Sequence, residues 1–234
     1  MLTAEIQQEA QAMKRTPLGS RKLPRYTKGE EIMNMVTHIV GGAVGIIGLI
    51  LCIVRAIGQG SAGIIGALVF GVSMIVVYTV SSVYHGLKPS TGKKVLQVLD
   101  HCGIYFLIAG TYTPISLCAF APRYPLLGWG MVMFQWGLTA LAVTLTAIDL
   151  RKYRVFSMIC YIGMGWAVLP FLPQAMTVLT GTGFAWLLAG GLAYTFGAIL
   201  YGIGSKKAWF HSVFHIFTVL GSALQLISVA FFVF

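Results

Sequence analysis

Long apolar runs alternate with short polar and basic stretches along most of this chain. A membrane-spanning helix needs about 20 predominantly apolar residues, and the pattern predicts seven such spans. They are Met35–Ile57, Gly63–Tyr84, Leu99–Phe120, Leu126–Ile148, Val155–Leu172, Gly183–Tyr201 and Phe210–Phe234. Because the runs are continuously apolar rather than alternating, they are not strands of a membrane β-barrel. The predicted fold is therefore an all-α membrane protein, a seven-transmembrane helix bundle.

The composition agrees with a membrane protein. Of the 234 residues, 57% are hydrophobic and only 9% are charged, whereas about a quarter of the residues of a soluble domain are charged. We predict a polar basic segment over residues 1–30 and a transmembrane domain over residues 31–234. No short apolar core with a cleavage site precedes the first span, so we expect no cleavable leader. The four cysteines fall inside apolar runs and are expected to pack as small apolar side chains.

The basic residues are distributed unevenly between the two predicted membrane faces. Fourteen of the sixteen Lys and Arg lie in the N-terminal segment and in every second loop after it, whereas only Arg55 and Arg123 lie on the opposite side. Positive residues accumulate on the cytoplasmic side of a membrane. The N-terminus is therefore predicted to be cytoplasmic and the C-terminus outside. This orienting role also accounts for the net charge of +10, so we expect no nucleic-acid partner.

All five histidines fall within a turn or two of the predicted cytoplasmic face. Ionisable side chains near a bilayer core are costly and usually mark function. His211 and His215 are four residues apart, so they share a helix face about 6 Å apart along the axis and can bind one ion together. This spacing is familiar from helical zinc sites, and His85 would supply a third nitrogen. The sequence predicts a Zn²⁺ site formed by His85, His211 and His215.

Two further residues at this depth are predicted to be catalytic. Asp100 could bind the metal directly or act as general base toward an attacking water. Ser81 lies one turn deeper than His85 and could orient a ligand or stabilise a developing oxyanion. Polar side chains continue from His215 along one face of the last span, which predicts an interior that reaches past mid-membrane: Thr218, Ser222 and Gln225.

The remaining histidines have less demanding explanations. About 100° separates His101 from Asp100 around a helix, which favours bonding to backbone or headgroups for His101. His38 shares a helix face with Asn34 and Glu31 and could belong to a polar cluster between helices; a three-histidine site is complete without it. Glycines on the first span indicate close helix packing: Gly41, Gly45 and Gly48.

Five motifs resemble those of one family, the progestin and adipoQ receptors, and within it the bacterial haemolysin III-like branch. They are EEIMNMVTH at 30–38, SSVYH at 81–85, LDHCGIY at 99–105, AGTYTP at 109–114 and HSVFH at 211–215. The resemblance covers essentially the whole membrane region, and the motifs together are highly specific.

The resemblance implies a seven-helix bundle with a cytoplasmic N-terminus in a bacterial cell membrane. It also implies a zinc ion held by His85, His211 and His215, with Asp100 beside it. The family has been compared with alkaline ceramidases, which suggests hydrolysis of lipid amides or esters, and its bacterial members have been linked to haemolysis and to membrane-lipid homeostasis. The long N-terminal extension of the animal receptors is missing, so we do not expect hormone reception.

Three functions remain open at this point. The first is a zinc-dependent hydrolase acting on a membrane lipid or lipid-like substrate. The second is a receptor or sensor in which zinc only joins helices together. The third, a pore-forming haemolysin, is physically the least favoured, because seven apolar spans are inserted in their host membrane almost irreversibly.

Overall fold

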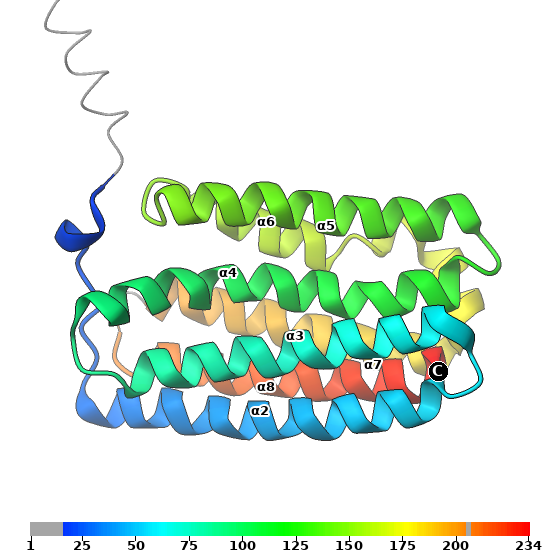
Figure 1. Cartoon of the computed structure of the whole chain (residues 1–234), viewed down its shortest axis with the longest axis horizontal. Coiled ribbons are helices and arrows are strands. Elements are labelled where there is room, and N and C mark those ends of the chain that lie inside the picture. The colour runs from blue at the N-terminus through cyan, green and yellow to red at the C-terminus, as the bar shows by residue number, and fades with distance from the viewer. Residues whose placement is uncertain (1–15, 205–206) are drawn as a thin grey trace, which may run out of the picture.

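The computed structural model describes residues 16–204 and 207–234, and this part of the chain is helical with no strand (Figure 1). Three basic residues that entered the charge count, Lys14, Arg15 and Lys206, lie outside the described residues. The elements in chain order are η1 (Leu18–Ser20), α2 (Lys28–Ala56), α3 (Gly60–Gly86), α4 (Thr91–Pro114), the π-helix η2 (Ile115–Phe120), α5 (Pro125–Ile148), α6 (Arg154–Gly165), η3 (Leu169–Phe171), α7 (Leu172–Gly204), α8 (Phe210–Ser228) and the π-helix η4 (Val229–Val233).

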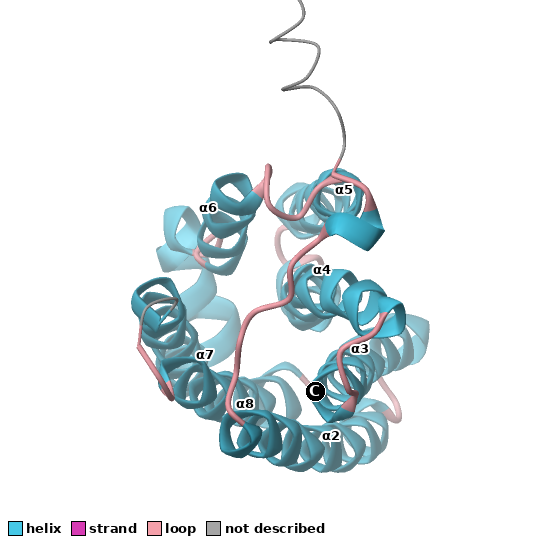
Figure 2. Ribbon diagram, turned by 90° about the vertical axis from the view of Figure 1, so that its left-hand side faces the viewer, coloured by secondary structure: helices cyan, strands magenta, loops and turns pink. Residues whose placement is uncertain are grey.

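The long helices run side by side as one bundle (Figure 1). Viewed along the bundle, α3 packs between α2 and α4, and α8 packs between α2 and α7 (Figure 2). The starts of α2, α4 and α8 and the end of α3 therefore lie at one end of the bundle. We call it the histidine end, because His85, His211 and His215 lie in or next to these terminal turns and His38 and His101 lie about three turns inside α2 and α4.

Two helices begin earlier than the apolar pattern predicts. α2 starts at Lys28 because Thr27 and Glu30 form a capping box, in which the Glu30 N–H donates to the Thr27 hydroxyl and the Thr27 N–H donates to the Glu30 carboxylate. α4 starts at Thr91, where the Ser90 hydroxyl accepts from the Lys93 N–H. Polar residues at both starts, including Glu31 and Lys93, are thereby fixed on helices instead of in loops.

The glycines of α2 allow the predicted close packing. A Cβ at Gly41 would meet the ring of Tyr78, and a Cβ at Gly45 would come within 3.1 Å of the backbone nitrogen of Ile75, both on α3. A Cβ at Gly48 would meet Leu226 of α8 at 3.1 Å. α2 thus lies unusually near both helices that carry the histidine pair and its partner.

The predicted fifth span, Val155–Leu172, is not one continuous helix. α6 ends at Gly165 after 12 residues, about 18 Å of the roughly 30 Å that a bilayer core requires. A turn and η3 follow, and α7 is itself interrupted at Thr180, whose φ of 61° is not helical. Pro170 and Pro173 lack the N–H that would continue an α-helix through this stretch.

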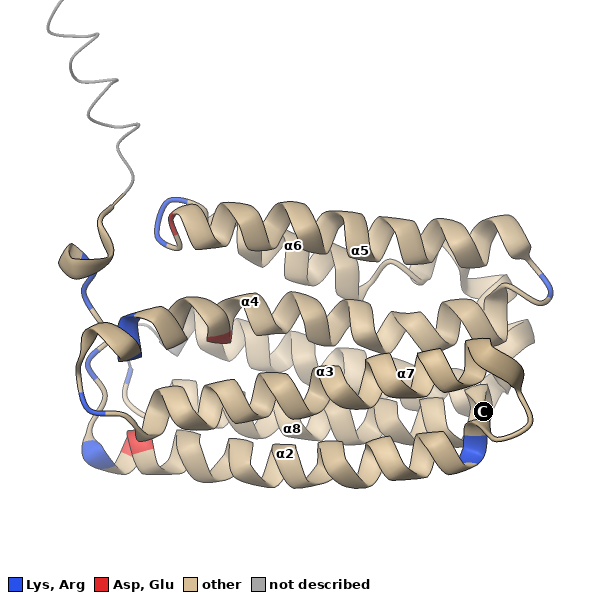
Figure 3. Ribbon diagram, in the orientation of Figure 1, with Lys and Arg blue, Asp and Glu red and all other residues tan. Residues whose placement is uncertain are grey.

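Six helical stretches among the described residues are long and apolar enough to cross a membrane. One of them, Arg154–Ile203, contains 50 residues and includes both α6 and α7. Lys and Arg gather at the histidine end, whereas Arg55 and Arg123 lie at the opposite end (Figure 3).

Candidate metal centre

The three predicted metal ligands come from two helices that meet at the histidine end. His85 lies in the last turn of α3, and His211 and His215 lie in the first two turns of α8. Trp209, the residue before α8, adopts a left-handed conformation with φ 68° and donates its backbone N–H to Glu30 of α2 at 2.7 Å. This bond fixes the start of α8 against α2 and so determines the position of His211 along the bundle axis.

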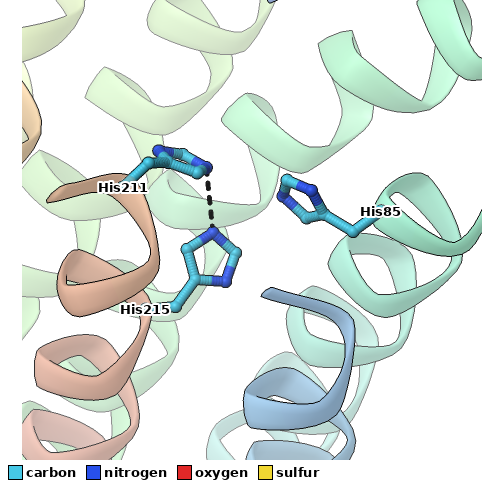
Figure 4. Close-up of side chains that lie close together, drawn as sticks. All are labelled: His85, His211 and His215. Atoms are coloured by element: carbon cyan, nitrogen blue, oxygen red, sulfur yellow. Dashed lines mark hydrogen bonds between the residues drawn. The ribbon is translucent and has the colours of Figure 1, made fainter. Parts of the chain in front are cut away.

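The three rings converge on one point (Figure 4). One ring nitrogen from each lies within 4.8 Å of the others, and the Nε2 atoms of His211 and His215 are 3.0 Å apart. His85 and His215 expose only 2% and 1% of their surface. The sequence prediction that these residues come together is thereby met, and the group could hold a metal ion.

The donor set fits zinc. Zinc–nitrogen bonds of about 2.0–2.1 Å in a tetrahedral site place neighbouring donors roughly 3.3 Å apart, close to the spacing of the two α8 nitrogens. The Nε2 atom of His85 is buried and has no hydrogen-bond partner. A buried polar atom left without a partner is costly and calls for an unseen water or ion. The Nε2 atoms of His211 and His215 lie within hydrogen-bond distance of each other, and both can turn a lone pair toward an ion in place of that hydrogen bond, as three-histidine ligation requires.

The two predicted catalytic residues lie beside the cluster rather than in it. Asp100 and Ser81 both line the cavity onto which the α8 histidines open. The Ser81 hydroxyl is buried without a hydrogen-bond partner, so it is free to donate to a bound group. The nearest basic atom recorded for the Asp100 carboxylate is Nδ1 of His101, at 3.9 Å.

The other two histidines differ from each other. His101 forms its hydrogen bonds outside the cluster. Its Nδ1 donates to the Gln97 carbonyl at 2.8 Å, and its Nε2 lies 3.3 Å from the Tyr201 hydroxyl. This agrees with the backbone-bonded role that the sequence favoured. His38 stacks on His215 with ring centroids 3.8 Å apart, and both of its nitrogens are buried without partners. His38 is therefore next to the cluster, although it is not one of the three converging residues.

Three residues near the cluster were not predicted to belong to the site: Glu31 and Tyr26 contact its rings, and Lys93 contacts Glu31. Glu31 accepts from Nδ1 of His85 at 2.7 Å, and Lys93 forms an ion pair with the same carboxylate. Tyr26 stacks on His211 with centroids 4.9 Å apart, and burial raises the pKa of its phenol, which keeps it neutral. Glu31 shares a helix face with Asn34 and His38, which was a usable signal. Tyr26 precedes the first helix, where no periodicity marked it.

Tyr26 is held in place by a segment that crosses the histidine end (Figure 2). At its beginning, Thr16 donates its N–H to Asp149 at 3.0 Å, and Arg21 donates to the Ile148 carbonyl at 3.0 Å. At its other end, the capping box joins Thr27 to α2. The segment Thr16–Thr27 therefore spans the bundle from the α5–α6 turn to α2, above the histidines.

A cavity leads from the cluster into the bundle. It has an empty volume of about 1200 Å³, part of which is open to the surroundings, and it is lined by α2, α3, α4, α6, α7 and α8. Its lining on α8 runs from His211 to Gln225, a rise of about 21 Å along a helix. Most of the wall between is apolar, with Leu107, Met158 and Phe214 among its residues. The predicted polar stripe on α8 does face this interior, through Thr218 and Gln225.

The fold and this cluster define a multi-pass integral membrane protein with three buried histidines at one end of its bundle. The chain belongs to the haemolysin-III related family, whose sequence model matches residues 26–226. It is 37% identical over 217 residues to "Hemolysin-3" of Bacillus cereus, covering 92% of this chain and 97% of that protein. It is 34% identical over 208 residues to "Hemolysin-3 homolog" of Bacillus subtilis (strain 168), covering 88% and 96%. The resemblance inferred from the five motifs is confirmed.

Proposed function

We propose that this protein is a zinc-dependent hydrolase that cleaves an amide or ester bond of a membrane lipid. The observation that carries the proposal is the convergence of three imidazoles, two of which, His211 and His215, line a long, mostly apolar cavity together with Asp100 and Ser81. His85, His211 and His215 would hold the zinc. The cavity can take an acyl chain along the bundle while its polar headgroup stays at the histidine end.

Zinc, when bound, supplies a Lewis acid and makes water a stronger nucleophile near neutral pH. In the proposed reaction the Asp100 carboxylate takes the proton of the attacking water and passes it to the leaving amine or alcohol. The free hydroxyl of Ser81 donates a hydrogen bond to the carbonyl oxygen as it gains negative charge. The apolar wall excludes bulk water and orients the acyl chain. Such a reaction would serve membrane-lipid homeostasis.

Two measurements on purified protein test the proposal. Zinc should copurify with the wild type and with His101→Ala, and it should be lost from His85→Ala, His211→Ala and His215→Ala. With zinc present, ceramides or acyl phospholipids should release fatty acid. Asp100→Ala should slow release by a factor of about 10²–10⁴, as expected for a lost general base, while keeping its zinc. A wild-type rate no higher than that of Asp100→Ala on every lipid would refute the hydrolase.

A second function, a receptor or sensor with structural zinc, is favoured by one feature of the site. The ligands join α3 to α8, which are separated by more than 120 residues of sequence, so a metal would link distant parts of the bundle. On this hypothesis His215→Ala lowers the thermal stability and the metal content, and no lipid is consumed by any variant. The names of the two relatives add haemolysis as a third candidate. Lysis of red cells or liposomes by added purified protein would support it, but the apolar helices oppose release from the host membrane.

For topology we propose seven spans, with a cytoplasmic N-terminus and an external C-terminus. The stretch Arg154–Ile203 has 50 residues, about 75 Å if fully helical, which is more than twice the roughly 30 Å bilayer core. Its breaks at Trp166–Phe171 and at Thr180 support two crossings. The excess of Lys and Arg at the histidine end supports a cytoplasmic location for that end.

Single cysteines in a background without the native ones test this topology. Arg123→Cys should react with an impermeant maleimide added to intact cells, and Lys88→Cys should react only after the cells are lysed. A C-terminal epitope should be accessible from outside. Labelling of Lys88→Cys in intact cells would overturn the orientation, and a cytoplasmic C-terminus would overturn the count of seven.

A further inference from the structure

A buried lysine next to the metal centre requires an explanation. Lys93 exposes only 3% of its surface, and lysines are almost never fully buried unless they are paired. Its ammonium group donates to the Glu31 carboxylate and to the Leu87 carbonyl, and it lies 5.2 Å from the centre of the Tyr84 ring. Tyr84 and Leu87 flank His85 along the chain. Lys93 therefore joins the start of α4 to the turn of α3 that carries a predicted metal ligand.

Glu31 connects this lysine to His85. One carboxylate oxygen, Oε1, takes the ammonium group, and the other, Oε2, lies 2.7 Å from Nδ1 of His85. A carboxylate carries no hydrogen of its own, so the shared hydrogen must sit on Nδ1. The Asn34 amide nitrogen is 3.4 Å from the same atom, but Nδ1 has only one hydrogen, and the shorter contact with Glu31 takes it.

This hydrogen bond determines which face His85 presents to the cluster. With the hydrogen on Nδ1, the lone pair is on Nε2, the buried atom that has no partner. A histidine that binds a metal usually donates its other N–H to a carboxylate or carbonyl, which fixes the ring and makes it a better ligand. His85 has this arrangement.

We propose that Glu31 is a positioning residue of the metal site, which holds His85 with Nε2 toward the ion and supplies negative charge near it, while Lys93 only moderates that charge. The inference rests on the proposed zinc site. Three neutral imidazoles leave the two positive charges of zinc uncompensated. Glu31 offsets part of them from the far side of His85, and Lys93 balances part of Glu31.

The pair Glu31 and Lys93 allows a decisive comparison, because removing either residue breaks the same ion pair. The zinc affinity of purified wild type, Glu31→Gln, Glu31→Ala and Lys93→Met is measured by competition with a chromophoric chelator. We expect Glu31→Ala to bind zinc about 10–100-fold more weakly, which is the usual effect of losing a residue that hydrogen-bonds to a metal ligand. Glu31→Gln keeps an accepting oxygen without the charge and should fall between. Lys93→Met should bind as tightly as the wild type or more tightly.

Two readouts distinguish positioning from a purely structural link between helices. Cobalt(II) in place of zinc reports the ligand field through its visible absorption, which should shift in Glu31→Gln. Thermal unfolding of the metal-free proteins measures the helix link alone, and there Glu31→Gln and Lys93→Met should be destabilised alike. Equal losses of zinc affinity in these two variants, or an unchanged affinity in Glu31→Gln, would overturn the inference. A wild type that binds no zinc would instead refute the proposed metal site itself.

Discussion

Replacing Gly41 by alanine tests whether the packing of α2 against α3 supports the histidine cluster. A Cβ at this position would lie 2.7, 2.8 and 3.0 Å from three carbons of the Tyr78 ring, whereas ordinary contacts are 3.4–4 Å. Tyr78 is completely buried, and its hydroxyl donates to the Thr218 carbonyl at 3.1 Å and contacts Ser222. The ring therefore cannot move away from α2 without disturbing its bonds to α8.

The expected cost follows from these contacts. Inserting a methyl group into a well-packed interior costs about 1–3 kcal/mol, and weakening a buried hydrogen bond adds about 0.5–1.5 kcal/mol. Alanine regains about 1 kcal/mol of helix propensity over glycine. Gly42→Ala has the same gain on the same helix, and its Cβ would lie 4.0 Å from the nearest Tyr78 atom. Gly41→Ala should therefore be less stable than Gly42→Ala by about 1–4 kcal/mol.

The assay is unfolding of both purified variants in mixed micelles of increasing denaturing-detergent content, followed by circular dichroism. Zinc affinity is the second readout, because Tyr78 contacts His38 edge to face and His38 stacks on His215. We expect Gly41→Ala to bind zinc more weakly than Gly42→Ala. Equal stability of the two variants would refute the packing argument. A stability loss without any change in zinc affinity would refute the coupling of Tyr78 to the site.

Three further outcomes can be checked on the same preparations. Burial alone would raise the pKa of Asp149, but hydrogen bonds from Thr16, Lys152 and Arg151 lower it to about 2 from 3.8. The ionised carboxylate therefore stabilises the folded protein, by at most about 2 kcal/mol. This stability should be present at neutral pH and lost as the pH falls from about 4 to 2. Asp149→Asn should show no such loss in that range, and a wild-type curve identical to the variant's would contradict the pKa shift. Thr27→Ala should destabilise the protein by about 1 kcal/mol through loss of the α2 cap, and Thr27→Ser should not; equal unfolding midpoints of the two would argue against the cap. Tyr26→Ala should speed the removal of zinc by a soluble chelator, while Tyr26→Phe, which keeps the ring over His211, should leave the rate near that of the wild type; equal rates for all three would show that Tyr26 does not cover the site.

The convergence of His85, His211 and His215 could be predicted because it depends on two properties that the sequence shows directly: the depth of each residue in the membrane and the spacing of residues along one helix. Apolar run lengths place each residue at a depth, and the spacing of four places two imidazoles on one helix face. Both properties survive errors of a few residues in the helix ends. Contact between the side chains of α3 and α8 required only that both polar faces turn inward, which the polar residues along them indicated.

Lys93 escaped prediction for the opposite reason, and Glu31 was foreseen only as a member of a polar cluster with Asn34 and His38. Charged residues beside an apolar run are normally solvated and orient the chain. Lys93 was counted among these orienting charges, and Glu31 was placed outside the first span. Their inward direction depends on where α2 and α4 begin, which the caps at Thr27 and Ser90 decide. Those caps are visible in the sequence, but the contact between the two helix starts arises only from tertiary packing.

The apolar pattern hid the break after α6 but not the one inside α7. The break after α6 falls among the apolar residues 166–169, whereas the break at Thr180 falls in the stretch 173–182 left between the fifth and sixth predicted spans. Pro170 and Pro173 indicated that the end of the fifth span was uncertain. Thr180 adopts a positive φ, a conformation that β-branched residues disfavour, so sequence preference did not predict it. The Thr180 side chain is exposed, and its hydroxyl accepts from the Gly183 N–H at 3.3 Å, so Thr180 caps the helix that resumes after the break.

Two adjacent carboxylates at the start of α2 explain how one helix positions both ligand-bearing helices. Glu30 accepts the backbone N–H of Trp209, just before His211, and Glu31 accepts the N–H of His85. Consecutive residues on a helix point about 100° apart, so one can face α8 while the other faces α3. The capping box at Thr27 fixes the rotation of this first turn. The geometry of the histidine cluster is thus determined by α2, a helix that supplies none of the three converging rings. A shift in the start of α2 should therefore move all three rings.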